Sequence, residues 1–129
     1  MIALDTNVVV RYLVRDDPDQ AARADEVIDT LTPSSPGFVS SIVLVELFWV
    51  LTRSYRVAPR AVARHLEEFV GSDDIVAENP SGVRFATAAV KGGADFADAL
   101  VAEAARRAGA HETVTFDKRA SSKLGFRLL

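Results

Sequence analysis

Two aspartates stand directly after short apolar segments that predict β-strands. Asp5 follows residues 2–4 (Ile-Ala-Leu), and Asp117 follows residues 113–116 (Thr-Val-Thr-Phe). The carboxyl ends of parallel strands meet at one edge of a sheet, which is where ligands bind in open α/β folds. We therefore expect both carboxylates at one pocket, although each could instead cap the helix that follows it.

A third carboxylate, Glu46, interrupts a segment that is otherwise apolar from Ile42 to Leu51. A helix that is apolar on all sides is expected to be mostly buried. A buried carboxylate must be protonated, paired with a cation or bound to a metal, because leaving it unpaired is costly. Glu46 is therefore predicted to be a buried functional acid, with an ion pair to a distant arginine as the alternative.

Asp95 and Asp98 lie three residues apart at the start of a predicted helix. Asp95 fits the position of an N-cap, and Asp98 lies where the helix dipole favours an acid. Small and apolar residues surround Asp98, and a capping partner at this position is more often Glu or Gln. Asp98 is therefore predicted to be a site residue, and Asp95 an additional acid.

The chain has no cysteine and only two histidines, His65 and His111, which are not at a metal-ligand spacing. Any metal would therefore be held by oxygen, which favours Mg²⁺ or Mn²⁺. Carboxylates gathered in one pocket repel one another, and a divalent cation compensates that repulsion. With no Gly-rich phosphate loop in the sequence, the remaining chemistry is hydrolysis by a metal-activated water.

Short apolar segments alternate with helical ones along the 129 residues, without a linker, repeat or low-complexity tract. Such alternation predicts one α/β/α domain over residues 1–129, with a parallel sheet and helices on both faces. The expected strands are 2–4, 38–39, 75–77, 113–116 and 126–129. The expected helices are 7–14, 18–31, 41–54, 58–70, 80–91 and 95–108, followed by a turn or short helix at 117–123.

Composition excludes disorder as the main state, because hydrophobic residues make up 49% of the chain. The net charge of −3 does not itself indicate a nucleic-acid partner. Local basic clusters could nevertheless contact RNA phosphates, or could be solvated faces and local ion pairs. The candidates are Arg11, Arg15, Arg53, Arg60, Arg64, Lys118 and Arg119. No segment is apolar enough to span a membrane and no secretory signal is visible, so a cytoplasmic location is expected.

Four segments, in order, resemble the PIN-domain ribonucleases and, within them, the VapC toxins of bacterial VapBC toxin–antitoxin systems. They are residues 5–7 (Asp-Thr-Asn), 45–47 (Val-Glu-Leu), 95–100 (Asp-Phe-Ala-Asp-Ala-Leu) and 115–118 (Thr-Phe-Asp-Lys). The resemblance covers essentially the whole chain. It implies a three-layer α/β/α fold with strand order 3-2-1-4-5. It also implies an endoribonuclease that depends on Mg²⁺ or Mn²⁺ and acts on tRNA or rRNA.

The resemblance also implies residue roles and partners. The catalytic and metal-binding acids would be Asp5, Glu46, Asp98 and Asp117, with Asp95 as a less regular extra ligand, and the pocket-lining residues would be Thr6, Asn7 and Thr115. The implied partners are a second copy of the chain and a VapB-like antitoxin whose C-terminal segment blocks the site. Ala120 departs from the family pattern, which often has an aromatic residue there, and this bears on packing rather than chemistry.

Two other functions remain open from the sequence. The first is another Mg²⁺-carboxylate α/β domain, such as a phosphohydrolase or a phosphoacceptor receiver. Residues 5–7 lack the second aspartate that an aspartyl-nucleophile phosphatase needs, and the absence of any aspartate between Asp29 and Asp73 disfavours a receiver. The second is a non-catalytic PIN-like module that binds RNA or protein, and the presence of all four acids argues against it.

Overall fold

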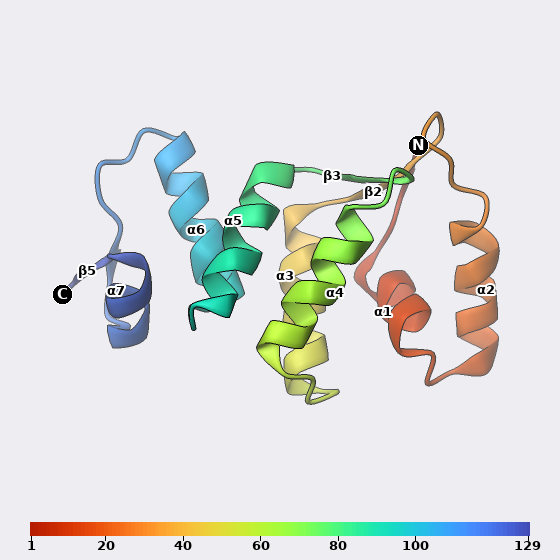
Figure 1. Cartoon of the computed structure of the whole chain (residues 1–129), viewed down its shortest axis with the longest axis horizontal. Helices are drawn as coiled ribbons and strands as arrows, with labels where there is room; N and C mark the ends of the chain where they lie inside the picture. The colour runs from red at the N-terminus through yellow and green to blue at the C-terminus, as the bar shows by residue number, and fades with distance from the viewer.

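The computed structural model describes all 129 residues, which form seven helices and five short strands (Figure 1). Every strand and helix predicted from the sequence is present, with ends that agree to within one helical turn. In chain order the elements are β1 (Ile2–Ala3), α1 (Thr6–Val14), α2 (Pro18–Ile28), β2 (Gly37–Val39), α3 (Ser41–Arg53), α4 (Pro59–Val70), β3 (Ile75–Ala77), α5 (Pro80–Lys91), α6 (Phe96–Arg107), β4 (Val114–Thr115), α7 (Lys118–Leu124) and β5 (Arg127–Leu128).

Helix starts follow the capping residues in the sequence. The Asp17 side chain accepts a hydrogen bond from the backbone N–H of Gln20 at 3.1 Å, and Pro18 occupies the first turn of α2. Ser40 caps α3 in the same way, accepting from the backbone N–H of Val43 at 3.2 Å. These caps satisfy backbone donors that have no partner within the helix, so local sequence fixes where each helix begins.

The strands form two separate parallel sheets. In the first sheet β2 lies between β1 and β3, with Gly37 paired to Ile2 on one side and Ile75 on the other. In the second sheet β4 pairs only with β5. The α/β class with parallel strands is confirmed. The expected strand order 3-2-1-4-5 is not found as one continuous sheet, because β1 and β4 do not pair.

The segment formed by β4, α7 and β5 lies at one end of the molecule, beyond α6, while α1 and α2 lie at the other end (Figure 1). The backbone carbonyl of Gly93 accepts a hydrogen bond from Arg119 Nε of α7 at 2.9 Å, which ties this segment to the turn before α6. Strands β1 and β4 have two residues each, so pairing between them would add few backbone hydrogen bonds.

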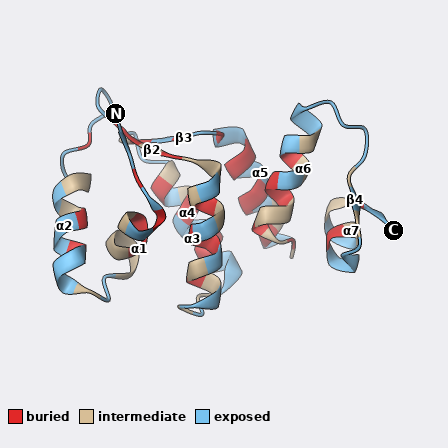
Figure 2. Ribbon diagram, turned by 180° about the vertical axis from the view of Figure 1, so that it is seen from behind, coloured by how far each residue is buried: buried red, intermediate tan, exposed pale blue.

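The hydrophobic core is one cluster of 21 buried residues, drawn mostly from helices α1, α3, α4, α5 and α6. Figure 2 shows buried residues concentrated along these helices, whereas α2 and α7 are largely exposed. Phe48 of α3 and Phe96 of α6 stack in this core, with ring centroids 4.9 Å apart and an interplanar angle of 10°. None of the helices combines the length and apolarity that crossing a membrane requires.

Gly37 shows why the sheet accepts a small residue at its centre. A Cβ atom at this position would lie 2.8 Å from Leu31 Cδ1 and 3.1 Å from both Ile75 Cδ1 and Leu4 Cδ1. Contacts that short require the neighbouring side chains to shift. Glycine at position 37 therefore allows β2 to pack beneath these three side chains.

Candidate functional site

Asp5 and Glu46 are brought together by Thr6, and we call these three residues the N-terminal acidic group. Asp5 caps α1, and its Oδ1 accepts a hydrogen bond from the backbone N–H of Thr6 at 2.8 Å. The hydroxyl of Thr6 donates to Glu46 Oε2 at 2.6 Å. Thr6 is buried, whereas both carboxylates are exposed. A buried hydroxyl therefore holds two surface acids that lie 41 residues apart in the chain.

The prediction that Glu46 is buried is wrong. Helix α3 buries one stripe, and no other element covers the opposite face, where Glu46 lies with Ile42 and Trp49. No arginine or lysine forms an ion pair with Glu46, so the alternative of a distant arginine partner is not found either. Apolar residues on this face, such as Ile42 and Trp49, made the helix look apolar on all sides in the sequence, but they remain exposed in the structure. The buried stripe consists of Leu44, Leu47, Phe48 and Leu51.

Asp95, Asp98 and Asp117 form a second set, which we call the C-terminal acidic group. Asp95 caps α6 by accepting from the backbone N–H of Asp98 at 3.1 Å. Asp117 caps α7 by accepting from the backbone N–H groups of Arg119 and Ala120 at 2.7 and 3.1 Å. Burial raises the pKa of the Asp98 carboxyl, and the charges of Asp95 and Asp117 raise it further, while Arg119 acts in the opposite direction.

The two acidic groups do not form one metal-holding cluster in this structure. The neighbouring charges that shift the pKa of Asp98 are those of Asp95, Asp117 and Arg119. No three acidic or histidine side chains lie close enough together to hold a metal ion. The donors are all oxygen atoms, which suit Mg²⁺ or Mn²⁺ in type, but their arrangement in this structure does not suit either ion.

Two further pocket residues have distinct surroundings. Asn7 is exposed and, with Arg11 and Arg23, lines a hollow of about 480 Å³ between α1 and α2. The hydroxyl of Thr115 accepts a hydrogen bond from the backbone N–H of Asp117 at 2.9 Å, so Thr115 orders the C-terminal acidic group. Arg23 was not predictable from the sequence, because only the packing of α2 against α1 brings it into the same hollow as Asn7.

The basic candidates divide into paired and unpaired side chains. Arg11 forms an ion pair with Asp16 at 2.9 Å, as the local-pair alternative expects. Arg15 pairs with Asp25 through two hydrogen bonds of 2.8 and 2.6 Å, a partner the sequence analysis did not consider. Arg119 is committed to the carbonyl of Gly93. The candidates that are exposed and form no ion pair are Arg53, Arg60, Arg64 and Lys118.

Glu103 is the one acid that the structure buries, and the sequence analysis did not select it. Its side chain accepts a hydrogen bond from Asn79 Nδ2 at 2.7 Å and lies 3.2 Å from Arg107 Nε. Its position three residues after Leu100, on the buried face of α6, was the signal that could have found it. Glu103 ties α6 to the start of α5, which is a structural role apart from the two acidic groups.

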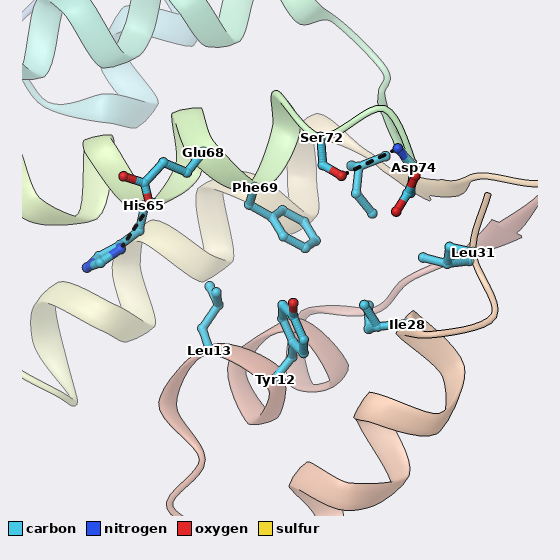
Figure 3. A pocket seen from close by; sticks show the side chains of 10 residues that line it. Tyr12, Leu13, Ile28, Leu31, His65, Glu68, Phe69, Ser72 and Asp74 are labelled. Carbon is cyan, nitrogen blue, oxygen red and sulfur yellow. Dashed lines mark hydrogen bonds and ion pairs between the residues drawn. The ribbon is translucent and has the colours of Figure 1, made fainter. Parts of the chain in front are cut away.

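A separate apolar hollow of about 280 Å³ lies between α1, α2 and α4 (Figure 3). Tyr12 and Phe69 face each other across it, with ring centroids 6.4 Å apart. His65 and Glu68 lie at one end, with His65 Nδ1 3.9 Å from Glu68 Oε2. None of the five candidate acids lines this hollow, so it is not part of the acidic site.

The parallel strands, the helices between them and the acids at the starts of α1, α6 and α7 are those of an α/β protein. The model of the PIN domain family matches residues 2–125, and the chain therefore belongs to the PIN domain family. This family has a three-layer α/β/α fold, and its members are generally metal-dependent nucleases that usually use a divalent ion such as Mg²⁺. No curated protein matches the chain.

Proposed function

We propose that this protein is an endoribonuclease of the VapC type. The observation that carries the proposal is the hydrogen bond from Thr6 to Glu46, which joins two of the four candidate acids across the fold. Asp98 and Asp117, the other two, lie near each other at the starts of α6 and α7. Acids of this number and type are those that phosphodiester hydrolysis uses in nucleases with divalent ions.

The proposed cofactor is Mg²⁺ or Mn²⁺. Its ligands would be Asp5 and Glu46 from the N-terminal acidic group and Asp98 and Asp117 from the C-terminal acidic group, with Asp95 in support. The two groups must approach each other for this to happen. The cation would supply the positive charge that lets four carboxylates share one site.

The proposed substrate is tRNA or rRNA. Arg53, Arg60, Arg64 and Lys118 support this proposal, because they are exposed and no protein acid neutralises them. Arginine and lysine in this state can pair with phosphates and release bound counterions. Arg11 and Arg15 would contact RNA only after giving up their partners Asp16 and Asp25.

We also propose that the chain forms a homodimer and binds a VapB-like antitoxin, and that the homodimer and the antitoxin form a larger assembly. The support is the exposed apolar surface, which includes Val76 of β3 and Val101 of α6. A chain that stays monomeric in light scattering would contradict the homodimer. Stable, non-toxic expression of the wild type without any partner would contradict the antitoxin.

The proposed activity can be tested in a bacterial host that expresses either the wild type or Asp98→Asn. New RNA ends that carry a 5′-phosphate would be mapped across the transcriptome in both cultures. We expect ends that appear with the wild type and with the control Asp73→Asn, an exposed acid outside both groups, and not with Asp98→Asn. The same ends in the Asp98→Asn culture would contradict the assignment of Asp98.

A non-catalytic PIN-like binding module is the second candidate function. The separation of the two acidic groups favours it, because neither group alone offers the ligands for a metal ion. Calorimetry with Mn²⁺ distinguishes the two functions. Tight Mn²⁺ binding that is lost in both Glu46→Gln and Asp98→Asn supports the nuclease, and no Mn²⁺ binding by the wild type supports the binding module.

A further inference from the structure

The single tryptophan of the chain lies on the uncovered face of α3. Trp49 is 59% exposed, although the opposite side of the same helix is part of the hydrophobic core. A large apolar ring left in water forgoes the free energy that its burial would contribute, and tryptophan is enriched at binding interfaces. The exposed position of Trp49 therefore indicates a role in binding rather than in packing of the core.

Trp49 lies beside a proposed catalytic acid. It follows Glu46 by three residues, so the two side chains project from the same face of α3. Together with Val45 and Val50 they line a shallow hollow of about 360 Å³. The hydrogen bond from Thr6 fixes Glu46 at the edge of this hollow. A flat apolar ring is thus placed next to the acid and close to the start of α1.

An unpaired cation continues the same face. Arg53 follows Trp49 by four residues, is exposed and forms no ion pair. With a rise of 1.5 Å per residue, the backbone positions of Glu46, Trp49 and Arg53 are about 4.5 and 6 Å apart along the helix axis. One helix face therefore presents an acid, an aromatic ring and a guanidinium in succession.

We propose that Trp49 is a stacking platform for one base of a single-stranded RNA segment next to the cleaved phosphate, and that Arg53 contacts a neighbouring phosphate. This inference rests on the proposed ribonuclease function of Glu46. Aromatic rings that stand free in solvent stack on unpaired bases, and a duplex offers no such base. RNA is favoured over a protein partner because Trp49 shares its hollow with Glu46, a proposed acid of the reaction centre, so that a base on Trp49 lies beside the phosphate to be cleaved. A protein partner, for which Trp and Arg are also suited, is an outcome that the titration below distinguishes.

The lone tryptophan makes the platform directly measurable. The full-length chain would be titrated in EDTA, which keeps metal-dependent cleavage off, with a short mixed-sequence RNA oligonucleotide, while tryptophan emission is recorded. We expect single-stranded RNA to quench the emission in a saturable way, and the same sequence as a duplex to quench it far less. Because every emitted photon from tryptophan comes from Trp49, the signal needs no label.

Substitutions separate stacking from other effects. Trp49→Ala is expected to weaken single-stranded RNA binding about 10- to 100-fold, measured by the anisotropy of labelled RNA. Trp49→Phe keeps a ring and is expected to retain most of the affinity. Phe85→Ala removes another exposed aromatic side chain, on α5, and is expected to leave binding unchanged. In cleavage assays with Mg²⁺, Trp49→Ala is expected to raise KM with little change in kcat.

Several outcomes would overturn the platform. Emission that ignores RNA, or an unchanged RNA affinity in Trp49→Ala, would do so. Emission that shifts when the protein is diluted, without a response to RNA, would assign Trp49 to contact with a second copy instead. A wild type that binds RNA through Trp49 but never cleaves it would contradict the proposed nuclease function while leaving the platform in place.

Discussion

The N-terminal acidic group is held by a buried hydroxyl, whereas the C-terminal acidic group consists of two helix caps, Asp95 and Asp117, whose charges act on Asp98. Thr6 donates to Glu46 at 2.6 Å, so the first group has a hydrogen bond that fixes the position of a carboxylate. In the second group, burial and the charges of Asp95 and Asp117 raise the pKa of Asp98. The position of Glu46 in the first group is therefore fixed without a ligand. In the second group, a bound cation would offset the repulsion that Asp95 and Asp117 exert on Asp98.

This difference also concerns how the two groups are carried. Asp5 follows β1, and Glu46 lies in α3, which follows β2, so both come after strands of the first sheet, whereas Asp117 belongs to the β4–α7–β5 segment beyond α6 (Figure 1). The Phe48–Phe96 stack links α3 to α6, but no strand pairing links β1 to β4. The following predictions test whether the two groups act as one site.

The largest expected effect is on cleavage when either group loses one carboxylate. Glu46→Gln and Asp98→Asn should each reduce the RNA cleavage rate by about 100-fold or more, because each removes a charged group from the proposed reaction centre. Circular dichroism should show both variants folded. A variant of either group that cleaves at the wild-type rate would show that the other group works alone.

The second prediction concerns the distance between the groups. The chain has no cysteine, so Ser34→Cys and Ser122→Cys, both at exposed positions, allow two specific labels. We expect Mg²⁺ to shorten the mean distance between the labels, because a shared cation would draw the carboxylates together. The same labels in an Asp98→Asn chain should show no such change. An unchanged distance in a chain that binds Mg²⁺ would contradict a metal ion shared by the two acidic groups.

The third prediction compares the two threonine hydroxyls. Thr6→Val removes the donor that fixes Glu46, and should lower cleavage about tenfold, the effect of one hydrogen bond to a charged group. Thr115→Val should lower it less, because Asp117 keeps the hydrogen bonds from Arg119 and Ala120. Single-turnover rates of the two variants measure this difference. Equal losses of cleavage rate in the two variants would contradict the view that the Thr6 hydroxyl matters more to its acidic group than the Thr115 hydroxyl does to the other.

The smallest expected effect is on stability in the absence of metal. Because the pKa of Asp98 is raised on folding, its stabilising contribution is complete below the unfolded pKa and is lost as the pH rises through the folded pKa. Asp98→Asn should therefore raise Tm slightly at pH 7, measured in EDTA. The gain should vanish as the pH falls below about 3.9, where Asp98 is protonated in both states.

Asp25→Asn is the matched control with the opposite sign. The hydrogen bonds from Arg15 lower the pKa of Asp25, so its contribution is present above the unfolded pKa and is lost as the pH falls through the folded pKa. This variant should lower Tm at pH 7 and approach the wild type in acid. A fall in Tm for Asp98→Asn at pH 7 would contradict the repulsion that we assign to the C-terminal acidic group.

Much of the fold was predictable because its signals are local. Asp17, Ser40 and Asn79 cap helices at the positions where the sequence predicts helix starts. A cap and its target N–H lie within one helical turn, so neither depends on the rest of the chain. The same locality let the sequence place Asp5, Asp95 and Asp117 at helix starts, where all three accept backbone hydrogen bonds.

Burial and partners were less predictable because they depend on which elements meet. Apolar residues all around α3 predicted a buried Glu46, but only the side of α3 opposite Glu46 packs against other helices. Glu103 is buried and accepts from Asn79 only because α5 packs against α6. Arg15 found Asp25, which lies ten residues away on another helix. Each outcome is set by long-range packing that no local pattern contains.

Three features can be read from the amino-acid order alone: the alternation of strands and helices, the capping aspartates and the set of acids that resembles the PIN-domain ribonucleases. Three others exist only in the folded chain: Thr6 joins Asp5 to Glu46, Asp98 lies near Asp95 and Asp117, and Trp49 is exposed to solvent. Short-range hydrogen bonds and backbone preferences fix the first set of features. The second set follows from the three-dimensional packing of the helices, because contact and exposure are properties of surfaces that meet only in the folded chain.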